Sequence, residues 1–298
     1  MVVRVEVRAR RGRKNPLVFV AKKLEGTSVR EAAVYREWLA RHPIPLAPRF
    51  LGTLPSEGGA VLLFMQALPP RAGWPWGDQA KTRGVLAQLA RLHMSAVRPY
   101  PRAISDWDFE ASLAGSSQKA LDLLEEIPRR YLPHDLLRTR AAARRVVLCL
   151  GMLRRELLSS PRFGTTVLHG DVHSGNVALV PRPEGESPLF CDWARARVGS
   201  PLEDVSSWLK SLGLWEPEAA RRHDTLLQAY LDERGMNRAM DSELRASYWF
   251  AAACNGLAGA LLYYLHSAAE DLRNGRPADF RLARGWARVI RRAGAFVS

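Results

Sequence analysis

Residues 166–193, TVLHGDVHSGNVALVPRPEGESPLFCDW, decide how the rest of the chain is interpreted. They contain three short apolar runs, at 166–168, 177–180 and 189–191, and the last of these ends at an aspartate. A polar loop, 169–176, separates the first two runs, and a turn rich in proline and glycine separates the second from the third. The pattern predicts strand, loop, strand, turn and strand in that order.

Three oxygen-bearing side chains are expected to meet at one end of this hairpin. Asp171 and Asn176 lie five residues apart in the loop, and Asp192 follows the third strand at the end where the loop lies. Carboxylate and amide oxygens suit Mg²⁺, which takes one or two carboxylates and fills its other positions with water and phosphate oxygens. The alternative is that the two aspartates only cap turns, but turn chemistry does not require the asparagine or the hairpin.

The sequence HGDVHSGN at 169–176, followed by CDW at 191–193, resembles segments of the aminoglycoside phosphotransferase and choline kinase-like family, relatives of the protein kinases. Members of that family show HGD, four further residues and Asn, and then a hydrophobic residue, Asp and Phe or Trp. Both motifs are present here in the family's order, which is a far more specific signal than HGD alone.

The resemblance implies a role for each of these residues. Asp171 would be the catalytic base, Asn176 and Asp192 would hold Mg²⁺, and ATP would donate the phosphoryl group. His169 would shape the catalytic loop. Asp204, in the first turn of a helix predicted after the hairpin, matches the carboxylate that braces this loop in the family.

The N-terminal segment predicts an antiparallel hairpin with a lysine on its inner face. Residues 2–7 alternate between apolar and charged side chains, and 17–21 form a second apolar run after a charged turn. Lys22 shares a face with Val18 and Val20 by the two-residue period of a strand, so its ammonium group is directed inward. Such a lysine pairs with nucleotide phosphates, and the alternative is an exposed lysine at the end of a strand.

An amphipathic helix is predicted over 26–42, with Ser28 as its N-cap. Glu31 lies beside the apolar stripe of this helix, whereas Glu37 lies on another face. Glu31 is therefore the better candidate to position Lys22, and the similarity of REAAVY to the family's first long helix supports that ion pair. Ser28 and Glu31 also match a capping box, in which Glu31 would instead bond the backbone at Ser28.

A change from apolar to proline-rich sequence marks a predicted hinge. Residues 60–64 predict a strand, and the sequence MQALPP follows it at 65–70. The resemblance implies that this hinge offers backbone groups of Gln66 and Leu68 to adenine. We therefore expect a nucleotide-binding lobe at 1–66 and a helical lobe at 67–298, which carries the catalytic hairpin and the helices that bind the acceptor.

Helical periodicity dominates the rest of the chain. It predicts helices at 85–96, 121–127 and 136–158 before the hairpin, and an almost entirely helical segment from 216 to the end. Residues 246–265 are uncharged over a length that would span a membrane. Their alanine, glycine and asparagine content favours a buried core helix instead.

The net charge of +14 raises the question of a nucleic-acid partner. Only six of the 44 basic residues are lysine, and the arginines are scattered without a basic stripe interleaved with aromatic residues. An arginine-rich solvated surface is the favoured interpretation, and neither nucleic acid nor membrane is expected as a partner. Three widely separated cysteines without zinc spacing, and no signal-peptide segment, predict a cytoplasmic protein.

Together these features predict an α+β protein with a two-lobed, protein kinase-like fold, in which a small antiparallel sheet precedes a large, mostly helical lobe. In the family a strand and a glycine-rich loop precede the first hairpin, whereas this sequence begins almost inside what resembles the second strand. Either the loop is absent or shortened, or the true start lies upstream. The expected function is transfer of the γ-phosphoryl group of ATP to a hydroxyl of a small molecule, such as an aminoglycoside, a sugar or an amino alcohol. The alternatives are a catalytically weak, kinase-like binding protein and, least favoured, a nucleic-acid-binding protein.

Overall fold

The chain forms two compact units, each assembled from segments that lie far apart in the sequence. The computed structural model describes residues 1–7, 17–69, 74–95, 98–183, 185–236 and 240–297. The first unit comprises Met1–Trp107, Val167–Val198 and Ala229–Met236, and the second comprises Asp108–Thr166, Gly199–Gln228 and Asn237–Ser298.

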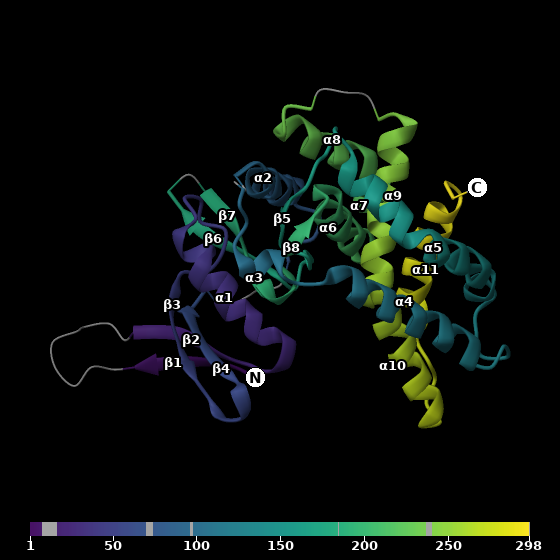
Figure 1. Cartoon of the computed structure of the whole chain (residues 1–298), viewed down its shortest axis with the longest axis horizontal. Helices are drawn as coiled ribbons and strands as arrows, with labels where there is room; N and C mark the ends of the chain where they lie inside the picture. The colour runs from purple at the N-terminus through teal and green to yellow at the C-terminus, as the bar shows by residue number, and fades with distance from the viewer. Residues whose placement is uncertain (8–16, 70–73, 96–97, 184, 237–239, 298) are drawn as a thin grey trace. The chain divides into compact units, whose positions relative to one another are not determined.

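A four-stranded antiparallel sheet lies in the first unit, with β2 between β1 and β4 (Figure 1). The predicted N-terminal hairpin is confirmed, because β1 and β2 pair with Val2 opposite Lys22. On its other side Lys22 pairs with Leu63, which is fully buried. The strands are β1 (Val2–Val7), β2 (Leu17–Leu24), β3 (Phe50–Pro55) and β4 (Val61–Gln66).

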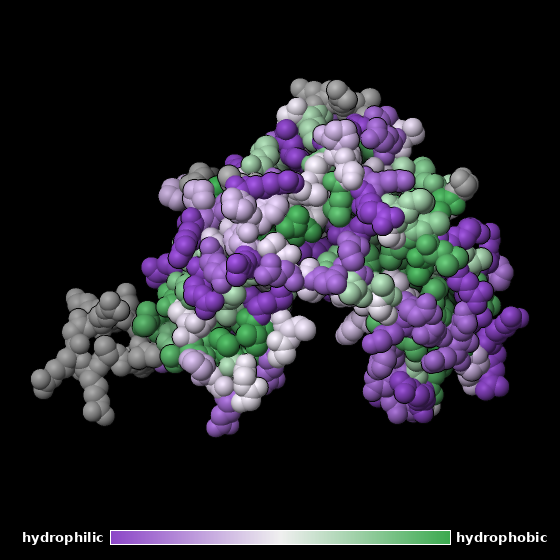
Figure 2. Space-filling view, in the orientation of Figure 1, coloured by the Kyte–Doolittle hydropathy of each residue, from purple (hydrophilic) through white to green (hydrophobic). Residues whose placement is uncertain are grey.

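The sheet keeps several large hydrophobic side chains in contact with solvent. Val2, Leu17 and Leu54 are each exposed by roughly half or more. Hydrophobic residues accordingly form green patches over the sheet in Figure 2. An antiparallel sheet tolerates this, because it needs to bury only one of its two faces.

The helix after β2 begins later than predicted. α1 runs from Arg30 to Glu37, and Ser28 lies before it in a 3₁₀ turn, Gly26–Val29. The Ser28 hydroxyl accepts the N–H of Glu25 at 2.9 Å and donates to the Glu25 carbonyl at 2.7 Å. Ser28 therefore caps the turn, and its predicted role as N-cap of the long helix is wrong. The physical reason is that the Ser28 hydroxyl accepts the backbone N–H of Glu25, three residues before it, and not an N–H of the helix that follows.

The stretch around the HGD motif folds in the predicted order of strand, loop, strand, turn and strand. After β5 (Thr166–Leu168) and the loop, β6 (Val177–Arg182) pairs antiparallel with β7 (Gly185–Phe190). Val177 lies opposite Phe190, so the end of the loop and the end of the last strand meet. β5 pairs with β8 (Arg197–Gly199) in a separate two-stranded sheet.

Helices make up most of the remaining chain. The predicted short helix at 121–127 is in fact part of α4 (Phe109–Glu126). Asp108 is the N-cap of this helix, and its carboxylate accepts the N–H of Ala111 at 2.9 Å. Its first half was missed because small and polar residues blur the apolar stripe there. The other helices are α2 (Gln79–Ser95), α3 (Arg102–Ser105), α5 (His134–Ser159), α6 (Pro201–Trp215), α7 (Pro217–Arg221), α8 (His223–Glu233), α9 (Ser242–Asn255), α10 (Leu261–Arg273) and α11 (Arg281–Gly294).

The uncharged segment 246–265 is divided between two helices. It covers most of α9, a π-helical turn at Gly256–Ala260 and the start of α10. Most of its α9 part is buried, including Tyr248 and Cys254. Within the described part of the chain, no helix combines the length and the apolar character that crossing a membrane requires.

The observed architecture is α+β, with a small antiparallel sheet and a mostly helical remainder, as predicted. The first compact unit contains both the sheet and the hairpin of β6 and β7, whereas the predicted lobes were divided at Gln66. The division into functional lobes at 1–66 and 67–298 stays a prediction.

Candidate active site

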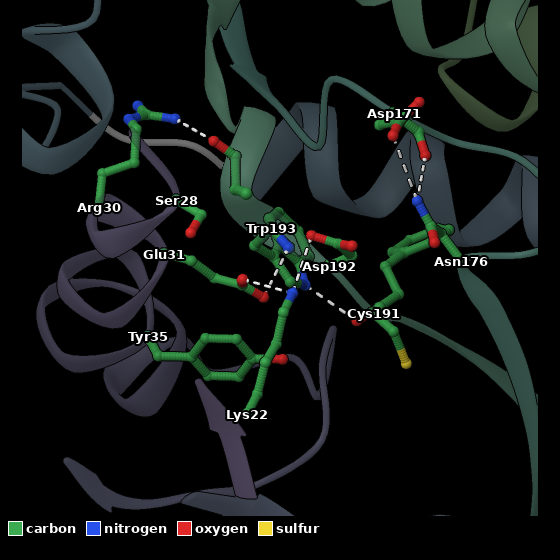
Figure 3. Close-up of polar contacts among 12 residues, drawn as sticks. Lys22, Ser28, Arg30, Glu31, Tyr35, Asp171, Asn176, Cys191, Asp192 and Trp193 are labelled. Atoms are coloured by element: carbon green, nitrogen blue, oxygen red, sulfur yellow. Dashed lines mark hydrogen bonds and ion pairs between the residues drawn. The ribbon is translucent and has the colours of Figure 1, made fainter. Parts of the chain in front are cut away.

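The loop 169–176 brings Asp171 and Asn176 together (Figure 3). The side-chain amide of Asn176 donates to the backbone carbonyl of Asp171 at 3.0 Å and lies 3.5 Å from its carboxylate oxygen Oδ2. The N–H of Asn176 also donates to the carbonyl of His173 at 2.8 Å. The side-chain nitrogen of Asn176 is thus used within the loop. Its side-chain oxygen is the group that remains for a ligand.

His169 fixes the start of the loop. Its Nδ1 accepts the N–H of Asp171 at 3.2 Å, and its Nε2 lies 2.9 Å from the carbonyl of Cys191. Since Nδ1 is an acceptor, the neutral ring carries its proton on Nε2 and donates it to that carbonyl. The ring is fully buried and packs edge-on against Trp193, with centroids 4.6 Å apart. One side chain thus ties the loop to the strand end before Asp192.

Asp192 stands where β7 has ended, in a left-handed backbone conformation with φ of 65°. Among the described residues, Asp192 is the one non-glycine residue whose φ is positive. The preceding N–H, of Cys191, donates to the carbonyl of Asn176 at 2.7 Å, so the backbone links the two predicted metal ligands. A non-glycine residue in this conformation is strained by roughly 1–3 kcal/mol, and such strain clusters at ligand sites.

Lys22 lies between two carboxylates (Figure 3). Its ammonium nitrogen is 2.7 Å from Glu31 Oε2 and 3.0 Å from Asp192 Oδ1. Burial lowers the pKa of Lys22, but Glu31 and Asp192 outweigh that effect and hold the pKa above its ordinary value. Lys22 therefore carries a full positive charge at neutral pH, and it connects the sheet, α1 and the segment after β7. The sequence predicted the contact with Glu31 but not the one with Asp192.

The carboxylate of Glu31 makes a second contact that decides between its two predicted roles. Oε1 accepts the N–H of Trp193 at 3.1 Å, while Oε2 holds Lys22. The residue is completely buried. Both oxygens are thus occupied by Lys22 and the Trp193 backbone, and the capping box of the preceding turn is made by Glu25 and Ser28. The ion pair is confirmed, and the predicted capping box between Ser28 and Glu31 is wrong.

Sequence reasoning missed Arg30, which holds the segment after Trp193 in place. Its guanidinium donates to the carbonyls of Ala103, Ala194 and Ala196, each at 2.7 Å. It also stacks 4.7 Å from the centre of the Trp107 ring. No sequence signal marks Arg30, because it resembles the many other arginines. Its contacts depend on the positions of the three carbonyls, which only the tertiary structure shows.

Gly170 occupies a position that only glycine fits. Its φ is 84°, and a Cβ built there would lie 2.1 Å from the carbonyl oxygen of Arg195 and 2.4 Å from a guanidinium nitrogen of Arg197. That guanidinium donates to the Gly170 carbonyl at 3.2 Å, and Arg197 is only 2 % exposed. The glycine of HGD therefore allows the loop to lie directly against the segment that follows Asp192.

The predicted hinge residues lie at and after the end of β4. Gln66 ends the strand, and its N–H donates to the carbonyl of Arg49 at 2.9 Å. That N–H is therefore not free for adenine, so an N–H contact would have to come from Leu68, two residues further on. The adenine contacts of both residues stay predictions.

Asp204 lies where the sequence placed it, in the first turn of α6, and its side chain is fully buried. The neighbouring Glu203 completes a capping box with Ser200 and binds Arg154 at 2.8 Å. The first turn of α6 is thus rich in buried charge. The predicted bracing role of Asp204 stays a prediction.

The donor set fits a magnesium ion by its chemistry. Asn176 has its amide oxygen left over, and Asp192, whose side chain is 48 % exposed, uses Oδ1 on Lys22. Two oxygen donors are what Mg²⁺ takes from a protein when phosphates and water supply the rest. Among the described residues, no group of three or more His, Cys, Asp or Glu side chains could hold a metal ion alone. The arrangement suits a cation that arrives with a phosphate ligand.

The sequence matches a family model described as the phosphotransferase enzyme family over residues 13–242. This range contains both motifs, Lys22 and Glu31. No curated protein sequence matches the chain.

Solved structures with related architecture include several kinases. Amicoumacin kinase hAmiN, in complex with AMP-PNP, Ca²⁺ and Ami, is similar with a TM-score of 0.60 and 15% identity, over 94% of this chain and 83% of that one. Aminoglycoside phosphotransferase APH(3'')-Id from Streptomyces rimosus, with ADP and streptomycin, has a TM-score of 0.56 and 19% identity, over 80% and 86%. The ethanolamine kinase of Plasmodium vivax has a TM-score of 0.55 and 13% identity, over 94% and 76%. At these identities the likeness establishes the fold, and it confirms the predicted kinase-like architecture.

Proposed function

The chain belongs to the phosphotransferase enzyme family, and we propose that it transfers the γ-phosphoryl group of ATP to a hydroxyl group of a small molecule. The observation that supports this most is the position of Lys22, held by Glu31 and Asp192 at the end of the hairpin that carries Asp171. Phosphoryl transfer requires little covalent chemistry from a protein, because positioning and neutralisation of charge supply most of the rate.

In this proposal Lys22 binds the phosphates of ATP. Its pKa is raised, so it remains an ammonium ion throughout the physiological range. Glu31 positions it, and the bond from Glu31 to the Trp193 backbone holds the hairpin in register with the lysine. The carbonyl of Gln66 and the N–H of Leu68 would contact the base. Bound Mg²⁺, with Asn176 and Asp192 as its protein ligands, would neutralise the phosphate charge.

Asp171 is the proposed catalytic base. Its side chain is 38 % exposed, so an acceptor can reach it, and Asn176 and His169 fix the backbone on which it stands. Asp171 orients the acceptor hydroxyl and takes its proton. The acceptor oxygen then forms a bond to the γ-phosphorus as the bond from that phosphorus to the bridging oxygen breaks, which leaves ADP.

The acceptor belongs to the class of small hydroxylated molecules. The related structures carry names or ligands as different as ethanolamine, amicoumacin and streptomycin. We therefore propose an aminoglycoside, a sugar or an amino alcohol as the acceptor class, and cytoplasmic ATP as the donor.

The test is transfer of label from γ-labelled ATP, with Mg²⁺, to a panel of aminoglycosides, sugars and amino alcohols by the purified full chain. GTP serves as a second donor. Asp171→Asn should lower turnover by about 10²–10⁴-fold, the usual contribution of a general base, with ATP affinity unchanged. Asp192→Asn should lower it by about 10²-fold or more and also weaken Mg²⁺-dependent nucleotide binding.

Asp106→Asn, a matched change at an exposed aspartate in the same unit, should leave turnover unaffected. Substantial activity in the Asp171 variant would contradict the assignment of the base. Binding of ATP without transfer to any acceptor would instead identify a kinase-like binding protein.

A further inference from the structure

A cavity formed entirely by residues of the second unit carries a concentration of positive charge. Its volume is about 560 Å³, within the range of small-molecule sites. Residues of α6, α7, α8, α9 and α11 line it, and none of them has a part in the proposed phosphoryl transfer. Its ionisable lining residues are Lys210, Arg221, His223, Asp224, Arg245, Arg288 and Arg292.

Three of these cations lack a carboxylate partner. Arg245 is paired with Asp224 at 2.9 Å, but no ion pair is formed by Lys210, Arg288 or Arg292 with any described residue. Elsewhere in this unit arginines are commonly paired, as in Arg284 with Asp135 at 2.8 Å. The cavity therefore has positive charge that the protein itself does not neutralise.

An aromatic ring holds two of the unpaired cations. The Lys210 ammonium and the Arg292 guanidinium each lie 4.5 Å from the centre of the Trp249 ring. The ring attracts cations, but the two charges repel each other. Burial, together with the nearby charges of Arg292 and Arg288, lowers the pKa of Lys210 to about 8. The charged form of Lys210 is therefore destabilised, and a bound anion would stabilise it.

We propose that this cavity binds a small organic molecule that carries a phosphate group. Arg288 and Arg292 are exposed, and their planar guanidinium groups match phosphate oxygens in pairs. A bare phosphate ion would fill only part of the space. Apolar and aromatic residues supply the contacts for an organic portion, namely Leu209, Leu214, Trp249, Trp286 and Val289. This proposal does not depend on the function proposed for the hairpin.

The first experiment measures binding of inorganic phosphate and of phenyl phosphate to the full chain by calorimetry at low salt and pH 7.5. Phenyl phosphate should bind more tightly, because its ring can use the apolar lining. Arg288→Gln and Arg292→Gln should each weaken it by about tenfold, since each removes a charge-assisted contact. The exposed Arg155 on α5 provides the matched control, and Arg155→Gln should leave the affinity unchanged.

A second experiment uses the titration of Lys210. The other charged groups that line its cavity are His223, Asp224 and the four arginines named above, and of these only His223 titrates near neutral pH. Burial lowers the pKa of His223 below 6.5, so it is already neutral at pH 7.5. Affinity for phenyl phosphate, a dianion in this range, should therefore fall as the pH rises above about 8.

Lys210→Arg keeps the charge at all of these pH values, so this variant should bind at pH 9.5 as it does at 7.5. Equal affinity of wild type, Arg288→Gln and Arg292→Gln would overturn the proposal. So would an equal loss in Arg155→Gln, which would indicate general attraction of anions to a basic protein. Tighter, steeply salt-dependent binding of an oligonucleotide to the same residues would also overturn it and favour a nucleic-acid partner.

Discussion

Two largely buried lysines, one in each unit of this protein, have neighbours of opposite charge. In the first unit Lys22 contacts two carboxylates within 3.0 Å, and its pKa is raised. In the second unit Lys210 has cationic neighbours, and its pKa is lowered to about 8. A paired lysine is held in one place and is suited to positioning a substrate. The charged form of an unpaired lysine is destabilised by burial and by its cationic neighbours, and a bound anion would remove that destabilisation.

The largest effect on stability is expected from breaking the paired site. Lys22→Met leaves the Glu31 carboxylate buried with only the Trp193 N–H as partner, and should lower the free energy of unfolding by about 3 kcal/mol. Combining it with Glu31→Gln should destabilise less than the sum of the two single changes, because the unpaired charge is then removed. Urea denaturation of the four proteins measures this coupling.

The neighbouring lysine provides a control for that experiment. Lys23 pairs with Glu25, whose side chain is 66% exposed, so Lys23→Met should change the stability by less than about 0.5 kcal/mol. Equal losses for Lys22→Met and Lys23→Met would show that the contacts of Lys22 add nothing beyond a surface ion pair.

A comparable effect is expected from the backbone beside the paired site. Gly170→Ala should destabilise by about 1–3 kcal/mol from its left-handed conformation alone, and the contact with the Arg195 carbonyl adds to this. Turnover should fall with it, since the loop that carries Asp171 must move. In contrast, Gly84→Ala, inside α2 where an added Cβ meets no atom within 4 Å, should stabilise by about 0.5–1 kcal/mol. Thermal melts distinguish the two.

A further effect is expected from the pH dependence of the unpaired site. Lys210 has a pKa of about 8 when folded and 10.5 ordinarily, so the unfolded chain binds more protons between these values. Its contribution to the free energy of unfolding should therefore rise as the pH increases from 8 to 10.5. Lys210→Met should remove this contribution, and saturating phenyl phosphate should reduce it. An identical pH profile in wild type and Lys210→Met would show that the lysine is not destabilised by its neighbours.

Much of the first unit was predictable from the chain because the signals there are local. The alternation at 2–7, the position of Lys22 on the inner face and the order of strands around HGD follow from two-residue periodicity and turn composition. Glu31 was a correct partner for Lys22 because the apolar stripe fixed its face of the helix. Ser28 was misplaced because a capping signal that spans only four residues fits more than one register.

What the sequence by itself determined was the set of chemical groups and their order: HGD with its asparagine, the later aspartate, the inward lysine and the alternation of strands and helices. Only the tertiary structure showed that Asp192 contacts Lys22, that Arg30 binds three carbonyls, and that Lys210, Arg288 and Arg292 line one cavity. The reason is physical. Periodicity fixes the face of an element on which a side chain lies, but pairing between elements depends on distances that local sequence does not encode.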